Sequence, residues 1–401
     1  MANSILVGTG CSLIDYLYTG IDFDSPAYRR YLSNTPGDGG LRPGELVFLE
    51  GLEQFSGRRW KDILPEITGD AAVASSNLGG PSVVSLLQAA QLLEAKDVTV
   101  EYFGIRGDDT AGTEIEAILD RTPLDTTNYE VRHGRTPATY VLSDPAWDNG
   151  AGERSFINST GVAGTYEVDE LPEAFFDHPV VAFGGTALVP VFHEELHRPV
   201  RRAHEGGSLT VVNTVYDFLN QSRAPDQPWP LGDREVTFPH TDLLILDAEE
   251  ARRLSGTTDL SRALRRFTEA GVSAVVITRG PDDLLAATRG GRFRPMEGRS
   301  FPVSARITRE LREGAGRSGD TTGCGDNFVG GVLYSLVEQI YAGEKQIDLY
   351  HAVTWGVASG GLACYHLGGT SLSDQPGEKH RRTAEYVRDY ARRLGASTGD
   401  A

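Results

Sequence analysis

Short, almost wholly apolar runs alternate with helical patterns through the second half of the chain. The runs lie at 180–183, 209–212, 243–246 and 274–278. Continuous apolarity of this kind is typical of strands that are buried on both faces of a parallel sheet. Apolar residues recur at helical spacing at 248–255, 259–270, 323–341, 346–365 and 377–394. The alternation predicts an α/β domain with a doubly wound, mostly parallel sheet flanked by helices.

The first third of the chain has shorter and less regular patterns. Strands are expected at 4–8, 98–105, 138–143 and 154–158, and helices at 82–93 and 111–119. Residues 21–75 are polar and turn-rich, with the breaker Pro36-Gly37-Asp38-Gly39-Gly40. Two further segments are predicted as loops, 221–235 and the mobile insertion 305–319. A few antiparallel strands of the first third are expected to form a small accessory piece beside the main sheet.

Composition places the chain among globular proteins. With 39% apolar residues in a length of 401 it can bury a sizeable core. No run approaches the ~20 apolar residues of a membrane-spanning helix. Residues 1–17 have no basic region, so they are expected to contain the first strand and not a signal peptide. The three cysteines, Cys11, Cys324 and Cys364, form neither a metal-binding spacing nor a disulfide framework, which favours a reducing cytoplasm.

The charge balance narrows the range of partners. The formal net charge of −18 repels nucleic acid and anionic membrane surfaces, so neither is expected as a partner. Only four of the 38 basic residues are Lys, and the other 34 are Arg. A salt-adapted source would explain low Lys together with high Asp and Glu. A GC-rich genome would explain the Arg bias equally well.

The segment Asp320-Thr321-Thr322-Gly323-Cys324-Gly325-Asp326-Asn327-Phe328 carries the clearest chemistry in the sequence. It leads into a helical pattern, and its glycines allow a tight turn with exposed N–H groups. Those groups and the helix dipole make an anion site. A carboxylate at such a site repels phosphate. Its presence is explained if Asp326 accepts a proton from an attacking hydroxyl while the amides hold a phosphoryl group. The ordinary structural explanation is a helix-capping Asp beside turn glycines.

This nonapeptide closely resembles the C-terminal signature of the ribokinase/PfkB carbohydrate kinase family, which is DTTGAGD followed by a small residue and Phe. Only Cys324, in place of Ala, and Asn327 depart from that signature. The resemblance continues in the order of the family's motifs at Gly8, Asp15, Asn77-Leu78-Gly79-Gly80, 102–112, Gly152-Glu153-Arg154, Asp247-Ala248-Glu249-Glu250, Thr278-Arg279-Gly280 and 352–369. Several weak matches in the right order support the one specific match.

The resemblance implies a ribokinase-like fold, in which a large α/β domain carries a small β lid. The kinase domain would span residues 1–375, with lid strands from within about 10–60 and 135–160. Residues 376–401 would be a C-terminal helix and tail of the same domain. The resemblance also allows a homodimer formed through the lid.

The resemblance further implies ATP-dependent transfer of the γ-phosphoryl group to a hydroxyl of a small sugar, with Mg²⁺ as cofactor. Asp326 would be the general base. The anion hole would be made by N–H groups of the first turn, at Gly323, Cys324, Gly325 and Asp326. Because the surface is acidic, the attraction for ATP would come from Mg²⁺, helix N-termini and a few Arg.

Family roles carried over to this chain complete the expected site. The sugar would be contacted by Asp15, Gly79, Gly80 and Glu153. ATP would lie along the carboxyl ends of the strands, near Asp247, Thr278, Gly280 and Gly325. Mg²⁺ would be held through water, with Glu250 as its anchor on the protein. Asp320 occupies the place where some relatives bind a monovalent cation.

The weaker matches also have structural explanations. Asp247 is expected to be the N-cap of its helix, and Glu250 to complete a capping box besides any contact with Mg²⁺. Asp15 is also the kind of residue that caps a turn after a strand. The Asn that usually follows the family's di-glycine is replaced by Val84, which removes one expected sugar contact.

Two alternatives remain for the function. A protein of the same fold that binds a sugar or nucleotide without turnover has no need of Asp326. An adenosine-type nucleoside kinase would need an apolar slot for its base, which Phe23, Tyr102 and Phe156 are suited to line. Carboxylates only accept hydrogen bonds, so Asp15 and Glu153 together favour a neutral sugar rich in hydroxyl donors.

Overall fold

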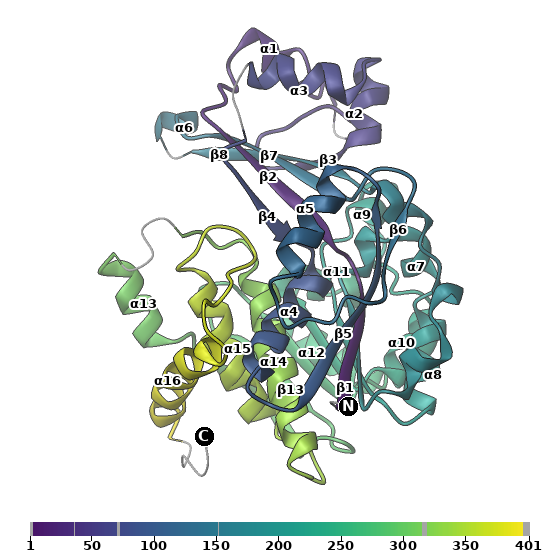
Figure 1. Cartoon of the computed structure of the whole chain (residues 1–401), viewed down its shortest axis with the longest axis vertical. Coiled ribbons are helices and arrows are strands. Elements are labelled where there is room, and N and C mark those ends of the chain that lie inside the picture. Colours follow the sequence, from purple (N-terminus) through teal and green to yellow (C-terminus); the bar gives the residue numbers. More distant parts are fainter. Residues whose placement is uncertain (1–2, 36, 70–72, 151, 315–318, 396–401) are drawn as a thin grey trace.

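The computed structural model describes residues 3–35, 37–69, 73–150, 152–314 and 319–395. Three of the expected segments fall partly outside these ranges: the breaker at Pro36, the insertion at 315–318 and the tail at 396–401. Figure 1 shows a large body of helices around a sheet, with a smaller layer of strands and helices above it.

Nine strands form the main sheet, in the order β14-β13-β12-β11-β10-β9-β1-β5-β6. Pairing is parallel from β12 through to β6 and antiparallel from β12 to β14. The strands are β1 (Asn3–Gly10), β5 (Val98–Gly107), β6 (Tyr129–Arg132), β9 (Val180–Gly184), β10 (Leu209–Asn213), β11 (Leu243–Asp247), β12 (Ala274–Thr278), β13 (Leu284–Thr288) and β14 (Met296–Phe301). The expected mostly parallel sheet is confirmed.

Helices cover both faces of this sheet, which makes it doubly wound. One face packs against α4 (Pro81–Leu93), α5 (Thr110–Leu119), α14 (Cys324–Tyr341), α15 (Leu349–Ala363) and α16 (Glu378–Arg393). The other face packs against α7 (Pro190–Glu194), α8 (His197–Glu205), α11 (Ala248–Ser255) and α12 (Leu260–Glu269). Because β9 to β12 lie between two apolar cores, their apolar runs are nearly continuous.

The lid is a second, five-stranded sheet in the order β3-β8-β7-β2-β4. Its strands are β2 (Leu13–Thr19), β3 (Leu46–Phe48), β4 (Ser75–Gly79), β7 (Ala138–Asp144) and β8 (Glu153–Ser159). Pairing is mixed, because β2–β7 and β3–β8 are parallel while β2–β4 and β7–β8 are antiparallel. One of its strands, β4, lies outside the two ranges expected to supply the lid.

Three helices cover the outer face of the lid sheet: α1 (Pro26–Arg29), α2 (Leu49–Ser56) and α3 (Trp60–Thr68). We call them the helical cover. Outward side chains of the strands, such as Tyr18 and Ile157, join them in a separate apolar core. The ring of Trp60 lies 4.8 Å from that of Tyr140. A homodimer through the lid stays a prediction, but it would have to use the outside of the cover or a sheet edge.

Two segments expected to lack regular structure contain helices. The turn-rich stretch at 21–75 holds α1, α2 and α3, and the stretch at 305–319 begins with α13 (Ala305–Arg312). In α13 only Ile307 is buried, and in α3 the apolar residues Trp60, Ile63 and Ile67 recur at helical spacing but Pro65 lies among them. Such helices are held by the surfaces on which they pack.

The segment expected as a loop at 221–235 is largely confirmed. Residues 224–233 contain neither helix nor strand, between α9 (Phe218–Arg223) and α10 (Arg234–Thr237). A short helix, α6 (Trp147–Gly150), joins β7 to β8 in the lid.

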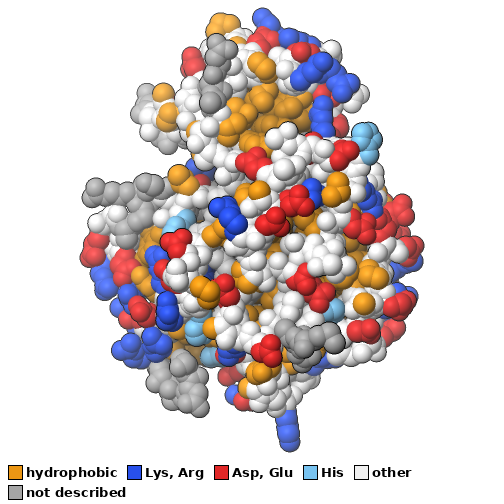
Figure 2. All heavy atoms as spheres, in the orientation of Figure 1, with side chains coloured by type: hydrophobic (Ala, Val, Ile, Leu, Met, Phe, Trp, Pro, Cys, Tyr) orange, Lys and Arg blue, Asp and Glu red, His pale blue; other side chains and the backbone are white. Residues whose placement is uncertain are grey.

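Side-chain charge is dispersed over the face of the molecule that Figure 2 shows, where acidic and basic groups are interspersed. None of the helices in the described ranges combines the length and apolarity needed to cross a bilayer.

Candidate active site

Residues from separate segments meet at one edge of the main sheet, below the lid (Figure 1). In a parallel sheet the carboxyl ends of neighbouring strands lie side by side. Asp247 ends β11 and Thr278 ends β12, and the two residues are partners in the pairing of these strands. The chain passes from the main sheet into the lid between β1 and β2, which brings Asp15 to the same edge.

The N-terminus of α14 is an open turn. Gly323 is the N-cap with a φ of 70°, and a Cβ there would lie 2.4 Å from Gly369 Cα, so only glycine fits. A Cβ on Gly325 would meet nothing within 4 Å, so that residue faces open space. Within the described residues, the N–H groups of Gly325 and Asp326 donate no hydrogen bond. Free donors at a helix N-terminus fit an anion such as a phosphate group.

Asn327 holds this turn against a distant loop. Its Nδ2 donates to the carbonyl oxygens of Gly323 and Gly369, both at 2.8 Å. In the sequence, Asn327 stands out only as a departure from the family signature. Its role depends on Gly369, which lies 42 residues further along the chain, so no local signal could have indicated it.

Asp320 joins the same loop to the lid. Its carboxylate accepts hydrogen bonds from the N–H of Thr322 at 3.0 Å and from the N–H of Gly368 at 3.2 Å. Nη2 of Arg154, on lid strand β8, lies 3.8 Å from Asp320 Oδ2. The carboxylate therefore already has partners, and its role toward a monovalent cation stays a prediction.

Asp326 lies in the first turn of α14 and is partly buried. Burial raises its pKa from 3.8 to about 6. Such a carboxylate is a better proton acceptor than an ordinary Asp, and it is still mostly ionised at pH 7. That combination suits a general base beside a phosphate site.

Asp15 faces the site from the lid. A Cβ on Gly79, in the neighbouring strand β4, would lie 2.2 Å from Asp15 Oδ2, so the carboxylate rests against the glycine backbone. Burial raises the pKa of Asp15 to about 7, the negative charges of Asp326 and Asp320 act in the same direction, and a hydrogen bond from Thr139 opposes them. These three carboxylates are therefore close enough to influence one another.

Gly80 allows the turn between β1 and β2 to pack on the N-terminus of α4. Its φ is 102°, and a Cβ would lie 2.7 Å from both Cys11 O and Ser12 Cα. The structure thus brings together Asp15, Gly79 and Gly80, three of the four residues predicted to bind the sugar. Their contact with a sugar stays a prediction.

The fourth of these residues, Glu153, does not join them. Asp15 is paired with Thr139, and Thr139 with Asn158, so these three share the face of the lid sheet that we call the cleft face. Along β8 the side chains alternate, which puts Arg154 on the cleft face and Glu153 on the other. Glu153 lies beside Gly44 instead, with Oε2 3.4 Å from where a Cβ of that glycine would be.

The expected capping box at the start of α11 is confirmed. Asp247 Oδ1 accepts from the N–H of Glu250 at 2.8 Å, and Glu250 Oε2 accepts from the N–H of Asp247 at 2.9 Å. Glu250 also accepts from the hydroxyl of Thr214 at 2.6 Å. Burial and the charge of Asp247 raise the pKa of Glu250 to about 8. A role of Glu250 toward Mg²⁺ stays a prediction beside this structural one.

The strand-end residues predicted to line the nucleotide site lie in accessible positions. Thr278 is half-buried at the end of β12, and Gly280 is exposed with a φ of 59° and open space around it. Among the described residues no group of three or more His, Cys, Asp or Glu is arranged to hold a metal ion. The few carboxylates near the site fit a Mg²⁺ ion that is bound mainly by the phosphates of ATP better than one bound mainly by protein side chains.

Two of the aromatic residues considered for a nucleobase slot belong to the core. Phe23 is 1% exposed within the lid's outer core, and Tyr102 is 0% exposed in the main core. Phe156 differs, because it is half-buried and lies on the cleft face beside Val141 and Leu46.

Two of the three cysteines meet beside the open turn. Cys324 Sγ and Cys364 Sγ lie 3.1 Å apart, although 40 residues separate them in sequence. Their spacing gave no sign of this pairing, because it arises from the packing of α14 against α15.

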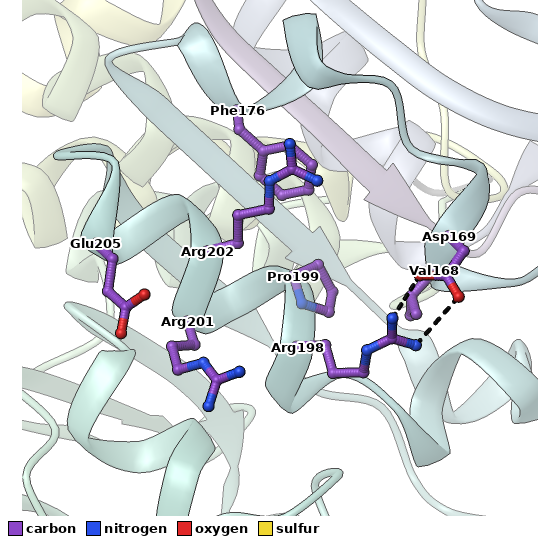
Figure 3. Close-up of a pocket in the computed structure, with 8 residues that line it drawn as sticks. All are labelled: Val168, Asp169, Phe176, Arg198, Pro199, Arg201, Arg202 and Glu205. Carbon is purple, nitrogen blue, oxygen red and sulfur yellow. Dashed lines mark hydrogen bonds and ion pairs between the residues drawn. The ribbon is translucent and has the colours of Figure 1, made fainter.

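A hollow of about 320 Å³ elsewhere on the surface does not fit the predicted chemistry (Figure 3). It lies between α8 and the turn at Glu173–Asp177, which lead directly into β10 and β9, so it is at the amino ends of the strands. Two of its three arginines are engaged by acidic groups, Arg198 by Asp169 and Arg202 by Glu173. The hollow is therefore at the opposite end of the sheet from the site.

Solved structures of kinases share this arrangement of a doubly wound domain and a β lid. An adenosine kinase from Schistosoma mansoni in complex with 2-fluoroadenosine has a TM-score of 0.68 at 18% identity, covering 93% of this chain and 98% of that one. A probable sugar kinase from Rhizobium etli has a TM-score of 0.65 at 17% identity, covering 98% and 99%. The fold is the ribokinase-like fold.

The sequence itself places the chain more narrowly. The profile of the pfkB family carbohydrate kinases matches residues 71–376, and the chain belongs to this family. The 2-dehydro-3-deoxygluconokinase of Escherichia coli K12 is 23% identical over 278 residues, which are 67% of this chain and 84% of that protein. The protein is a carbohydrate kinase that uses ATP to phosphorylate a sugar.

Proposed function

We propose that Asp326 is the general base of phosphoryl transfer and that the N-terminus of α14 is its anion hole. The observation that carries this proposal is the pair of N–H groups at Gly325 and Asp326 that donate to none of the described residues, beside a carboxylate whose burial raises its pKa to about 6. Asp326 takes the proton of the substrate hydroxyl, whose oxygen attacks the γ-phosphorus as the bond to ADP breaks. The N–H groups stabilise the charge on the transferring oxygens.

ATP is proposed to lie along the carboxyl ends of β11 and β12. The position of Asp247 and Thr278 at adjacent strand ends supports this placement, as does the open backbone at Gly280. Mg²⁺ would be held by the phosphates and by water, with Glu250 as the anchor on the protein. Asp320 is the proposed contact for a monovalent cation. The protein is proposed to act in the cytoplasm.

The substrate is proposed to be a sugar acid, which differs from the neutral sugar expected from Asp15 and Glu153. Two observations support the change. Glu153 is on the far face of the lid sheet, so the cleft face keeps one carboxylate of the pair. Arg154 takes its place there, 40% exposed at its side chain and 3.8 Å from Asp320, which makes at best a weak ion pair. A guanidinium presents a fork of donors that suits a substrate carboxylate.

Release of ADP with neutral monosaccharides, sugar acids, sugar phosphates and nucleosides tests both levels of this proposal. We expect the highest kcat/KM with a sugar acid. Arg154→Gln should reduce that value by about tenfold to two-hundredfold, the effect of losing a charged hydrogen bond of 1.5–3 kcal/mol, and leave neutral sugars unaffected. The matched control is Glu153→Gln, a neighbour on the opposite face of the same strand, which should change neither.

The outcomes distinguish the proposed sugar-acid substrate from the kinase activity itself. A best substrate without a carboxylate, with Arg154→Gln as active as the parent, would contradict the sugar acid and leave the kinase intact. No ADP release with any hydroxyl compound would contradict the kinase itself.

A nucleoside is the second candidate substrate, supported by one observation. Phe156, Val141 and Leu46 are neighbours on the cleft face, so the roof of the site has an apolar part. A base could stack on Phe156 there. If adenosine were the best substrate, Phe156→Ala would raise its KM while Arg154→Gln would not.

A further inference from the structure

The contact between Cys324 and Cys364 joins the anion hole to a second helix. Cys324 is the first residue of α14, and Cys364 is the C-cap of α15. Both side chains are partly exposed, and their sulfurs are 3.1 Å apart. A disulfide requires about 2.05 Å, so closing the gap needs a movement of roughly 1 Å.

The surroundings hold both cysteines in this position. α14 and α15 pack closely through glycines, since a Cβ on Gly331 would lie 2.4 Å from Trp355 O and one on Gly360 would lie 2.7 Å from Cys324 O. On the other side, a Cβ on Gly319 would lie 2.1 Å from Cys364 O. The close backbone packing around both residues therefore keeps Cys324 and Cys364 next to each other.

One member of the pair has the reactivity that thiol exchange requires. A hydrogen bond from Cys324 lowers the pKa of Cys364 to about 7, while the same contact and burial raise the pKa of Cys324 well above its ordinary value. Thiolate at neutral pH therefore forms on Cys364. The third cysteine, Cys11, is 1% exposed, and burial raises its pKa well above the ordinary value. Buried, protonated thiols are inert.

We propose that Cys324 and Cys364 form a reversible disulfide that switches the kinase off. This inference rests on the proposed anion hole, because Cys324 is adjacent to Gly325. Gly323 is already packed against Gly369, so the turn cannot follow a displaced Cys324 without changing shape. Linking the sulfurs pulls the first residue of α14 toward α15 and turns the free N–H groups of Gly325 and Asp326 away from the phosphoryl group.

The oxidant is a small-molecule disulfide. The Cys364 thiolate attacks one of its sulfurs, which forms a mixed disulfide and expels one thiolate. Cys324 then loses its proton and attacks the sulfur of Cys364, which expels the second thiolate and closes the protein disulfide. Two protons and two electrons leave the pair, and a dithiol returns them. Disulfides in reducing compartments are commonly of this transient, sensing kind.

Incubation of the full chain with glutathione at fixed ratios of disulfide to thiol tests the proposal. Turnover and the disulfide-linked peptides are followed together. We expect kcat/KM to fall at least tenfold under oxidising ratios, a peptide pair joined through Cys324 and Cys364 to appear in parallel, and dithiothreitol to reverse both changes. Cys364→Ser should keep the activity of the reduced protein and lose the sensitivity, while Cys11→Ala should keep the sensitivity.

Three results would overturn the proposal. These are an unchanged rate when the linked peptides are present, inactivation that persists in Cys364→Ser, and glutathione on Cys364 without any link to Cys324. The linked peptides are measured without turnover, so a protein that forms the link but phosphorylates no substrate in its reduced state would count against the proposed kinase chemistry and not against the disulfide.

Discussion

A carboxylate beside a phosphate site has two opposite effects. It accepts the proton of the attacking hydroxyl, and it repels the phosphates of ATP. Asp326→Asn keeps the size and hydrogen bonding of the side chain while removing both effects. Turnover is expected to fall by at least ~10²-fold, the usual contribution of a general base. ATP affinity, measured by calorimetry, should be unchanged or tighter. Turnover close to that of the parent would rule out Asp326 as the base.

The pKa of Asp326 sets the acid limb of the activity. A base must be ionised, so kcat/KM should fall as pH drops through about 6, the value to which burial raises this pKa. Asp15, with a pKa of about 7, titrates in the same range. The profile of Asp15→Asn separates the two groups, because the limb that remains belongs to Asp326. A limb near pH 4 in that variant would indicate an unperturbed carboxyl group.

The raised pKa of Asp326 should also make the thermal stability of the protein depend on pH. A carboxyl group whose pKa is raised by folding binds its proton more tightly in the folded state, so its contribution to stability is lost as pH rises through about 6. Asp326→Asn should therefore have a higher Tm than the parent at pH 7.5. The difference should shrink as the pH falls toward 4, which thermal melts at several pH values would follow.

Among single residues, sequence was most informative where a motif is continuous. The function of the turn at 320–328 could be predicted from the sequence, because the residues that form the proposed anion hole and base are contiguous. Glu153 and Arg154 show the limit. Adjacent residues on a strand point to opposite faces, so the motif alone could not tell which of the two side chains faces the cleft. Cys324 and Cys364 show a second limit of sequence-based prediction, because only the packing of α14 against α15 brings them together.

At the scale of elements, α14 is the component on which the site depends. Gly325→Val adds a β-branched side chain in open space, so the protein should still fold, while the added methyl groups occupy the position of a phosphate. ATP binding by calorimetry should weaken strongly with little change in Tm. Gly164→Val, at another glycine with ample room, is the control and should bind ATP normally. Equal affinity for ATP in both variants would contradict the assignment of the anion hole to the N-terminus of α14.

Elements differ in how far their own sequence determines them. The inner strands β9 to β12 could be predicted because burial on both faces leaves little choice of residue. The helical cover and α13 could not, because each is short, α13 has a single buried residue and α3 carries the helix breaker Pro65. In α1 only Tyr28 is buried, for example, and the helix is stabilised by its neighbours in the lid. Predictions from local pattern are therefore weakest for elements that exist only through tertiary contacts.

At the scale of the whole molecule, the charge of −18 opposes the approach of ATP. Added salt screens this repulsion, since the Debye length falls from roughly 30 Å at 0.01 M to about 8 Å at 0.15 M. The association rate of MgATP should therefore rise over that range, measured by stopped flow. Tetramethylammonium chloride provides the screening without a small cation, so a rise seen only with KCl would point to a bound cation instead.

The position of β1 also has a consequence for the synthesis of the protein. This first strand lies between β5 and β9 at the middle of the sheet, although β9 ends at Gly184. At the ~5–20 residues per second at which ribosomes elongate a chain, its apolar residues wait roughly 10–35 seconds for that neighbour to be translated. During that interval at least one edge of the nascent strand lacks its partner, since only β5 is translated early, and apolar side chains stay exposed. We therefore expect the newly made N-terminus to be bound by chaperones at the ribosome before the molecule has an active site.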